Sequence, residues 1–155
     1  MTLRADAHSM HFMTQRAEPG LWLPLFLAWM VALLATAGAL FLGEVMGKTP
    51  CVLCWYQRIA MFPLVLVLGL GLLDSDARCI RYALPLVLAG WCLALYHCLI
   101  FWGIVAEGLV PCGQGASCAD ADVQVAGWVP IPLLSWLAFT AMMVLLWIAR
   151  KRMKT

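Results

Sequence analysis

Charged residues are scarce in this sequence, since Asp, Glu, Lys and Arg make up only 12% of its 155 residues. The formal net charge of +2 at pH 7 is too small to suggest a nucleic acid as a partner. Hydrophobic residues make up 65% of the chain, compared with about 45–50% in a typical soluble domain. This composition predicts an integral membrane protein whose main surroundings are the lipid bilayer.

Long polar segments are also missing, so we expect no separate soluble domain. Four apolar runs can be read directly, and each is long enough to cross the hydrocarbon core as a helix of about 20 residues. The runs are continuous rather than alternating, which favours helices over the strands of a membrane barrel. The predicted fold is an all-α bundle of four transmembrane helices, at about 21–42, 55–73, 82–105 and 129–149.

Lysine and arginine are almost absent from two of the connections. The loop 43–54 contains only Lys48, and the loop 106–128 contains neither residue type. The tail 1–20, the connection between the second and third spans and the tail 150–155 together contain eight of these cations. By the positive-inside rule, we expect both termini to be cytoplasmic and the two loops to face outward.

Cysteine, in contrast, is abundant, and the predicted topology distributes it unevenly. Of the seven cysteines, Cys51, Cys54, Cys112 and Cys118 lie in or next to the outer loops. In a compartment that permits disulfides, four such cysteines are naturally interpreted as two pairs, Cys51 with Cys54 and Cys112 with Cys118. A bridge within C-x-x-C stabilises little, because loop-closure entropy grows with loop length. A short, exposed bridge is more useful as a labile one, which favours redox chemistry.

Cysteines in such motifs can also attach haem, bind zinc or form structural disulfides. Covalent haem needs C-x-x-C-H, and here Trp55 follows Cys54, so that use is excluded. A four-cysteine zinc site is disfavoured, because the outer compartment oxidises thiols and no His or carboxylate cluster accompanies them. We therefore predict no metal. Another interpretation is that both disulfides are purely structural, in which case the protein would be a non-catalytic membrane scaffold.

The stretch TPCVLCWYQR, residues 49–58, gives the first pair its local setting. Thr49 is predicted to cap a helix that begins at Pro50, which places both cysteines in the first turns. There the positive end of the helix dipole stabilises a thiolate, the nucleophile of disulfide exchange. At about 100° per residue, Arg58 projects on the same face one turn below Cys54. It is either a cation beside the redox centre or an interfacial side chain that reaches for lipid head groups.

Two further features are open to two interpretations each. The second pair lies in VPCGQGASCADADVQ, which offers little to pack and is either an accessible exchange loop or a loop fixed by a rigid bridge. His97 lies within the third apolar run. Ionisable residues in a membrane are functional candidates, but one hydrogen bond between helices also satisfies a neutral histidine.

Together these motifs resemble the DsbB family of membrane disulfide bond formation proteins. The resemblance covers about 21–149, and its most specific part is C-x-x-C-x-x-x-R at the outer start of the second helix. It implies a multi-pass enzyme of the bacterial inner membrane whose active cysteines face the periplasm. This enzyme would be a protein-disulfide:quinone oxidoreductase that reoxidises a DsbA-like thioredoxin-fold partner and passes the electrons to ubiquinone or menaquinone.

The resemblance also implies roles for the first pair and its neighbours. Cys51 and Cys54 would be the quinone-proximal pair, with Cys54 as the thiolate that faces the ring. Arg58 would position the quinone, and His97 would lie near the quinone pocket.

In the outer loop, the resemblance implies that the partner attacks Cys112 and that Cys118 passes electrons to Cys51. Only five residues separate Cys112 from Cys118, so the chain is similar to the short-loop members of the family. The vitamin K epoxide reductase group is an alternative, since it also uses outer cysteine pairs in a helical bundle. In that group, however, the C-x-x-C belongs to a later helix than the second.

Overall fold

The computed structural model describes residues 19–105, 124–125 and 129–153. Within these residues the chain forms four long helices, each long and apolar enough to cross a membrane. The predicted all-α fold with four spanning helices is therefore confirmed. The helices are α2 (Pro19–Leu40), α3 (Val52–Leu73), α4 (Cys79–Phe101) and α5 (Ile131–Arg152).

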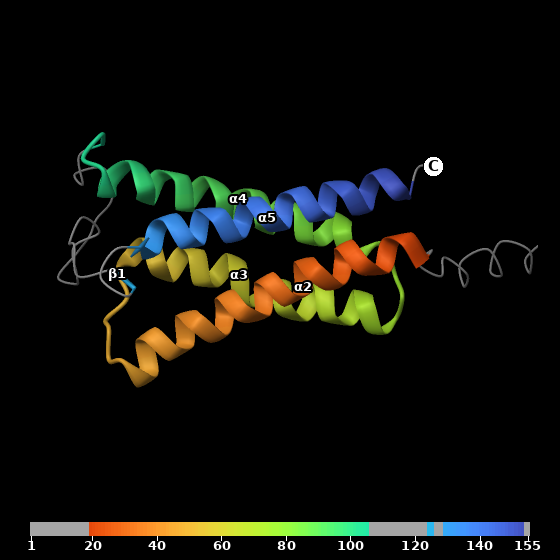
Figure 1. The fold of residues 1–155 in the computed structure, drawn as a ribbon, viewed down its shortest axis with the longest axis horizontal. Coiled ribbons are helices and arrows are strands. Elements are labelled where there is room, and N and C mark those ends of the chain that lie inside the picture. The colour runs from red at the N-terminus through yellow and green to blue at the C-terminus, as the bar shows by residue number, and fades with distance from the viewer. Residues whose placement is uncertain (1–18, 106–123, 126–128, 154–155) are drawn as a thin grey trace, which may run out of the picture.

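Short elements lie at the end of the bundle where α2 connects to α3 and where α5 begins (Figure 1). A π-helical turn, η1 (Phe41–Val45), continues α2. Strands β1 (Gln124–Val125) and β2 (Val129–Pro130) form a short antiparallel pair directly before α5. The predicted pair Cys112 and Cys118 lies outside the described residues.

One helix end differs from the predicted one for a local reason. The third predicted span extends to residue 105, but α4 ends at Phe101. Gly103 has φ +69°, and the amide of Ile104 bonds back to the carbonyl of Leu99 at 2.9 Å. This is the Schellman pattern, in which a residue with left-handed backbone, usually glycine, closes a helix.

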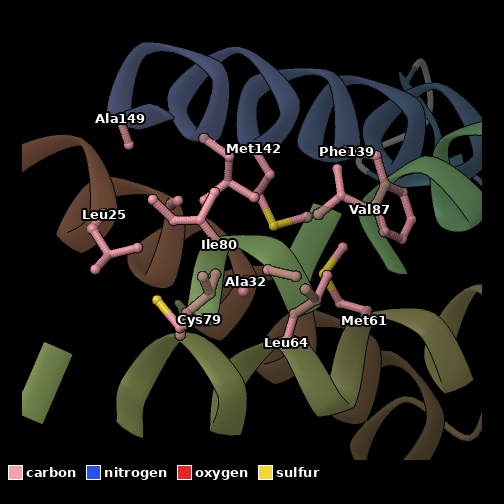
Figure 2. Close-up of a cluster of buried hydrophobic side chains, with 14 of the residues drawn as sticks. Leu25, Ala32, Met61, Leu64, Cys79, Ile80, Val87, Phe139, Met142 and Ala149 are labelled. Atoms are coloured by element: carbon pink, nitrogen blue, oxygen red, sulfur yellow. The ribbon is translucent and has the colours of Figure 1, made fainter. Parts of the chain in front are cut away.

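The helices form a closed ring, because each packs against its two neighbours and α2 packs against α5. In Figure 2, buried side chains from the helices point toward one another at the centre of the ring. Because lipid tails are as apolar as these side chains, packing and hydrogen bonds rather than the hydrophobic effect hold such helices together. The labelled core includes Leu25, Ala32, Met61, Leu64, Ile80, Val87, Phe139 and Met142.

Close approach and hydrogen bonds reinforce the helix contacts. The ring of Phe139 lies directly on Gly90, where any Cβ would collide with it. The indole of Trp29 on α2 donates a hydrogen bond to the Val65 carbonyl on α3 at 3.1 Å. No water is available to the indole N–H inside the membrane, so this hydrogen bond gives it a partner within the bundle.

Arg152 fixes which helix ends lie together. Its Nη1 donates a hydrogen bond to the carbonyl of Gly20 at 2.8 Å, so the start of α2 and the end of α5 are neighbours. The start of α3, with Cys51 and Cys54, lies at the opposite end of the bundle (Figure 1).

Candidate active site

The first cysteine pair lies at the N-terminus of α3, but not in the predicted position. Cys51 has an extended backbone, φ −69° and ψ 168°, and is the N-cap of a helix that begins at Val52. The predicted cap at Thr49 and first helical residue at Pro50 are therefore wrong. The reason is that the Cys51 sulfur itself accepts the hydrogen bond of the Cys54 amide, at 3.3 Å, as a capping side chain does.

Both cysteines of this pair are thiols, and their sulfur atoms lie 3.0 Å apart. The Cys51 side chain is only 4% exposed, whereas Cys54 is half-buried. The hydrogen bond to Cys54, together with burial, raises the pKa of the Cys51 thiol from an ordinary 9.0 to about 12. The helix N-terminus therefore does not make Cys51 a thiolate in this reduced state, and the prediction of a stabilised thiolate is wrong for Cys51.

A cavity of about 840 Å³ opens beside the pair, between α2, α3, α5 and the segment before Cys51. This volume is typical of a pocket for a small organic ligand. Cys54, Gln57 and Arg58 of α3 line it, together with Lys48, Thr49 and Cys51 from the segment before α3 and Ser135 from α5. The apolar part of the wall includes Val31, Leu34, Leu42, Met61, Phe62, Leu134 and Phe139.

Arg58 faces this cavity and contacts α2. Its Nη2 donates a hydrogen bond to the carbonyl of Ala39 at 2.7 Å, and its guanidinium carbon lies 5.4 Å from the centroid of the Trp55 ring. The missing side chain of Gly43 in η1 permits this approach, because a Cβ there would lie only 3.2 Å from Nη2. A guanidinium has five N–H donors, so the bond to Ala39 leaves others for an acceptor in the cavity.

His97 on α4 lies behind Cys51, and it is not among the described residues that line the cavity. It is 1% exposed, and its Nε2 lies 3.8 Å from the Cys51 sulfur. Its Nδ1 lies 3.1 Å from Nε2 of Gln57 on α3. His97 therefore makes a hydrogen bond between helices, one of the two uses that the sequence left open, and it also lies close to the sulfur of Cys51.

Two residues of this site were missed by the sequence analysis. Gln57 is 7% exposed, and its Oε1 accepts a hydrogen bond from Ser135 Oγ of α5 at 2.5 Å. The sequence could have indicated Gln57, because an amide inside an apolar helix must find hydrogen-bond partners in the bundle. The sequence gives no such indication for Ser135, because a single serine in an apolar helix can form a hydrogen bond to the backbone of its own helix.

The same geometry could hold a metal ion. The two sulfur atoms of Cys51 and Cys54 and a ring nitrogen of His97 lie within 4.8 Å of one another. Among the described residues only these three come together, one fewer than the four ligands of a structural zinc site.

Comparison with known proteins identifies the family. The family model described as disulfide bond formation protein DsbB matches residues 21–149. A probable disulfide formation protein of Metapseudomonas resinovorans is 46% identical over 132 residues, which cover 84% of this chain and 92% of that protein. Disulfide bond formation protein C of Bacillus subtilis is 37% identical over 120 residues, covering 77% of this chain and 87% of that protein.

A probable disulfide formation protein of Deinococcus radiodurans is also similar, with 38% identity over 137 residues that cover 83% of this chain and 89% of that protein. No solved structure matches the chain. The resemblance seen in the motifs is confirmed: this chain belongs to the DsbB family of disulfide bond formation proteins.

Proposed function

We propose that this membrane protein is a protein-disulfide:quinone oxidoreductase, which reoxidises a DsbA-like thioredoxin-fold partner and passes the electrons to a membrane quinone. Family membership supports thiol-disulfide chemistry. The observation that carries the finer proposal is that Cys54 and Arg58 line one largely apolar cavity within the membrane-spanning bundle. The family match favours this function over a vitamin K epoxide reductase-like one.

The residues of the cavity fit a quinone. The wall along α2 extends from Val31 to Ala39, about 12 Å at the rise of an α-helix, and Leu42 of η1 lengthens it, so that it is long enough for a ring and part of an isoprenoid tail. The apolar wall suits both. Arg58 would donate a hydrogen bond to a ring oxygen, and Cys54 would lie beside the ring. When bound, ubiquinone or menaquinone would accept two electrons and two protons from the dithiol.

The thiol steps proceed by exchange. A partner thiolate attacks Cys112 of the outer-loop disulfide and releases Cys118, and the partner's second thiol then resolves the mixed disulfide. The partner leaves oxidised, and the loop keeps both electrons as a dithiol. The Cys118 thiolate attacks Cys51 and releases Cys54 as a thiolate. Cys112 then attacks Cys118, which restores the loop disulfide and leaves Cys51 and Cys54 as a dithiol.

The distribution of cations supports an orientation in the bacterial inner membrane. Arg78 and Arg81 precede or begin α4, and Arg150, Lys151 and Arg152 end α5, all at the bundle end opposite the cysteines. By the positive-inside rule this end is cytoplasmic. The cysteine end then faces the periplasm, where a DsbA-like partner can reach the outer loop.

The test is an assay with purified protein, a reduced DsbA-like partner and either ubiquinone or menaquinone, in which quinone absorbance is followed. We expect quinone reduction that is lost in Cys51→Ala and in Cys112→Ala. Cys92→Ala is the matched control, because Cys92 is exposed on α4 away from the site. Wild type that reduces neither quinone, or cysteine variants as fast as wild type, would refute the proposal.

A structural scaffold makes a different prediction in a thiol-trapping titration. Catalytic bridges are reduced at mild potentials and give a trappable mixed disulfide with the partner, whereas structural bridges resist reduction. Trapping therefore separates the two functions without any quinone.

A further inference from the structure

A line of polar contacts extends from Cys51 through three helices. His97 on α4 lies between Cys51 and Gln57 on α3, and Ser135 on α5 completes the line. The side chains of Cys51, Gln57 and His97 are 4%, 7% and 1% exposed. Buried polar groups in lipid surroundings need partners, so the direction of each hydrogen bond in this line is a chemical constraint on the next.

The direction follows from the donors. The Ser135 hydroxyl donates to Oε1 of Gln57, which turns the amide nitrogen of Gln57 toward Nδ1 of His97. An amide nitrogen only donates, so Nδ1 must present its lone pair. An imidazole with a lone pair at Nδ1 carries its proton at Nε2, and Nε2 is the atom that lies 3.8 Å from the Cys51 sulfur.

We propose that Gln57 and Ser135 are positioning residues that hold His97 as the Nε2–H tautomer, so that His97 donates a hydrogen bond to the sulfur of Cys51. The inference builds on the proposed function only in taking Cys51 as a redox cysteine. It gives His97 a task that acts through Cys51 rather than on the wall of the cavity.

The chemical consequence concerns the reactivity of Cys51. A hydrogen-bond donor at sulfur favours the thiolate over the thiol. Cys51 is buried and bonded to Cys54, and both effects raise its pKa, while the contact with His97 lowers it. The donor therefore favours the release of Cys51 as a thiolate when Cys112 attacks Cys118, and it raises the fraction of Cys51 that can react with an alkylating reagent.

A purely structural role is the competing explanation, because the same contacts also join α3, α4 and α5. A structural link would affect stability, but it would not require one particular tautomer. The experiment therefore needs a readout of the ring nitrogens themselves.

The first measurement is nitrogen-15 NMR of the reduced, full-length protein labelled at histidine. His8→Ala together with His11→Ala leaves His97 as the single histidine, since the sequence has three. We expect Nε2 protonated and Nδ1 unprotonated. In Gln57→Glu, a carboxylate can only accept, so the proton should appear at Nδ1. A protonated Nδ1 in the parent protein, or an unchanged pattern in Gln57→Glu, overturns the inference.

The second measurement is the alkylation rate of Cys51 in the reduced protein at fixed pH, read by mass spectrometry. We expect Gln57→Leu to slow it about tenfold, which corresponds to a pKa rise of about one unit. Ser135→Ala should slow it less, and Ser135→Thr should restore it because the hydroxyl returns. Equal rates in Gln57→Leu and the parent protein would contradict the inference.

A matched control comes from α2. The buried hydroxyl of Thr36 has no hydrogen-bond partner among the described residues, so Thr36→Ala should leave both the tautomer and the Cys51 rate unchanged. A rate that falls as much in Thr36→Ala as in Ser135→Ala would show a general packing effect instead. Neither measurement uses quinone or partner, so a protein with the expected tautomer that reduces no quinone refutes the proposed function alone.

Discussion

Arg58 of α3 donates a hydrogen bond from Nη2 to the carbonyl of Ala39, at 2.7 Å, and so joins α3 to the last turn of α2. This contact keeps the guanidinium at the cavity, near Cys54. An arginine that only reached for lipid head groups would not need a partner on α2.

The first prediction concerns Arg58 itself. Arg58→Ala should raise the KM for quinone about 10–100-fold, because a hydrogen bond from a charged group contributes about 1.5–3 kcal/mol. Exchange between the partner and the outer loop should be unaffected, because it does not use the cavity. Arg81→Ala, at the other end of the bundle, is the control. A quinone KM equal to that of wild type would leave Arg58 as an interfacial residue.

Gly43 gives a second, more delicate prediction. A Cβ at this residue would lie 3.2 Å from Arg58 Nη2, so Gly43→Ala should displace the guanidinium and raise the quinone KM less than Arg58→Ala does. Gly20→Ala is the control on α2, because Gly20 does not line the cavity and a Cβ there would lie at an ordinary contact distance, 3.5 Å, from Arg152 Nη1. Steady-state kinetics of both variants test this. Equal effects of the two substitutions would show that Arg58 does not depend on Gly43.

The raised pKa of Cys51 predicts how the stability of the reduced protein depends on pH. The folded-state pKa of about 12 lies above the ordinary value of 9.0, so the folded protein binds this proton more tightly than the unfolded chain does. The resulting stabilisation is complete below pH 9 and is lost as the pH rises toward 12.

Unfolding of the reduced protein between pH 8 and pH 11 measures this dependence. Relative to Cys51→Ala, which lacks the thiol, the reduced wild type should lose stability over this range. Parallel curves for the two proteins would contradict the assignment of the high pKa to Cys51.

The contact between Gly90 and Phe139 predicts a loss of stability without a specific redox effect. Gly90→Ala adds a Cβ that collides with the buried ring, and overpacking of this kind costs about 1–3 kcal/mol. The midpoint of thermal unfolding in detergent should fall, whereas Gly38→Ala should leave it unchanged or raise it. A Gly90→Ala protein as stable as wild type would mean that the α4–α5 contact is looser than described.

Much of the fold follows from the sequence, because a continuous apolar run of about 20 residues can hardly be anything but a spanning helix. Helix ends are harder. The start of α3 depends on whether the Cys51 sulfur or the Thr49 hydroxyl caps the helix. The sequence is compatible with either cap. Gly103 ends α4 through a backbone conformation that many glycines do not adopt.

The candidate site was predictable only where its residues are close in sequence. Cys51, Cys54 and Arg58 lie within two turns, so their common place at one cavity follows from helix periodicity. The contacts of His97 with Gln57 and of Gln57 with Ser135 join three helices. They depend on the rotation of each helix in the bundle, which the uniformly apolar faces of these helices do not specify.

If the dithiol of Cys51 and Cys54 gives its electrons to a quinone in the cavity, quinol and disulfide form together. The most direct measurement mixes the fully reduced protein with ubiquinone or menaquinone without oxygen or partner, and quantifies quinol and disulfide together. We expect one quinol for each disulfide formed in the chain, that is two quinols once Cys112 and Cys118 have also been oxidised through Cys51 and Cys54, and none with Cys54→Ala. Quinol formed at the wild-type rate by Cys54→Ala, or no quinol from the wild type, would contradict the claim.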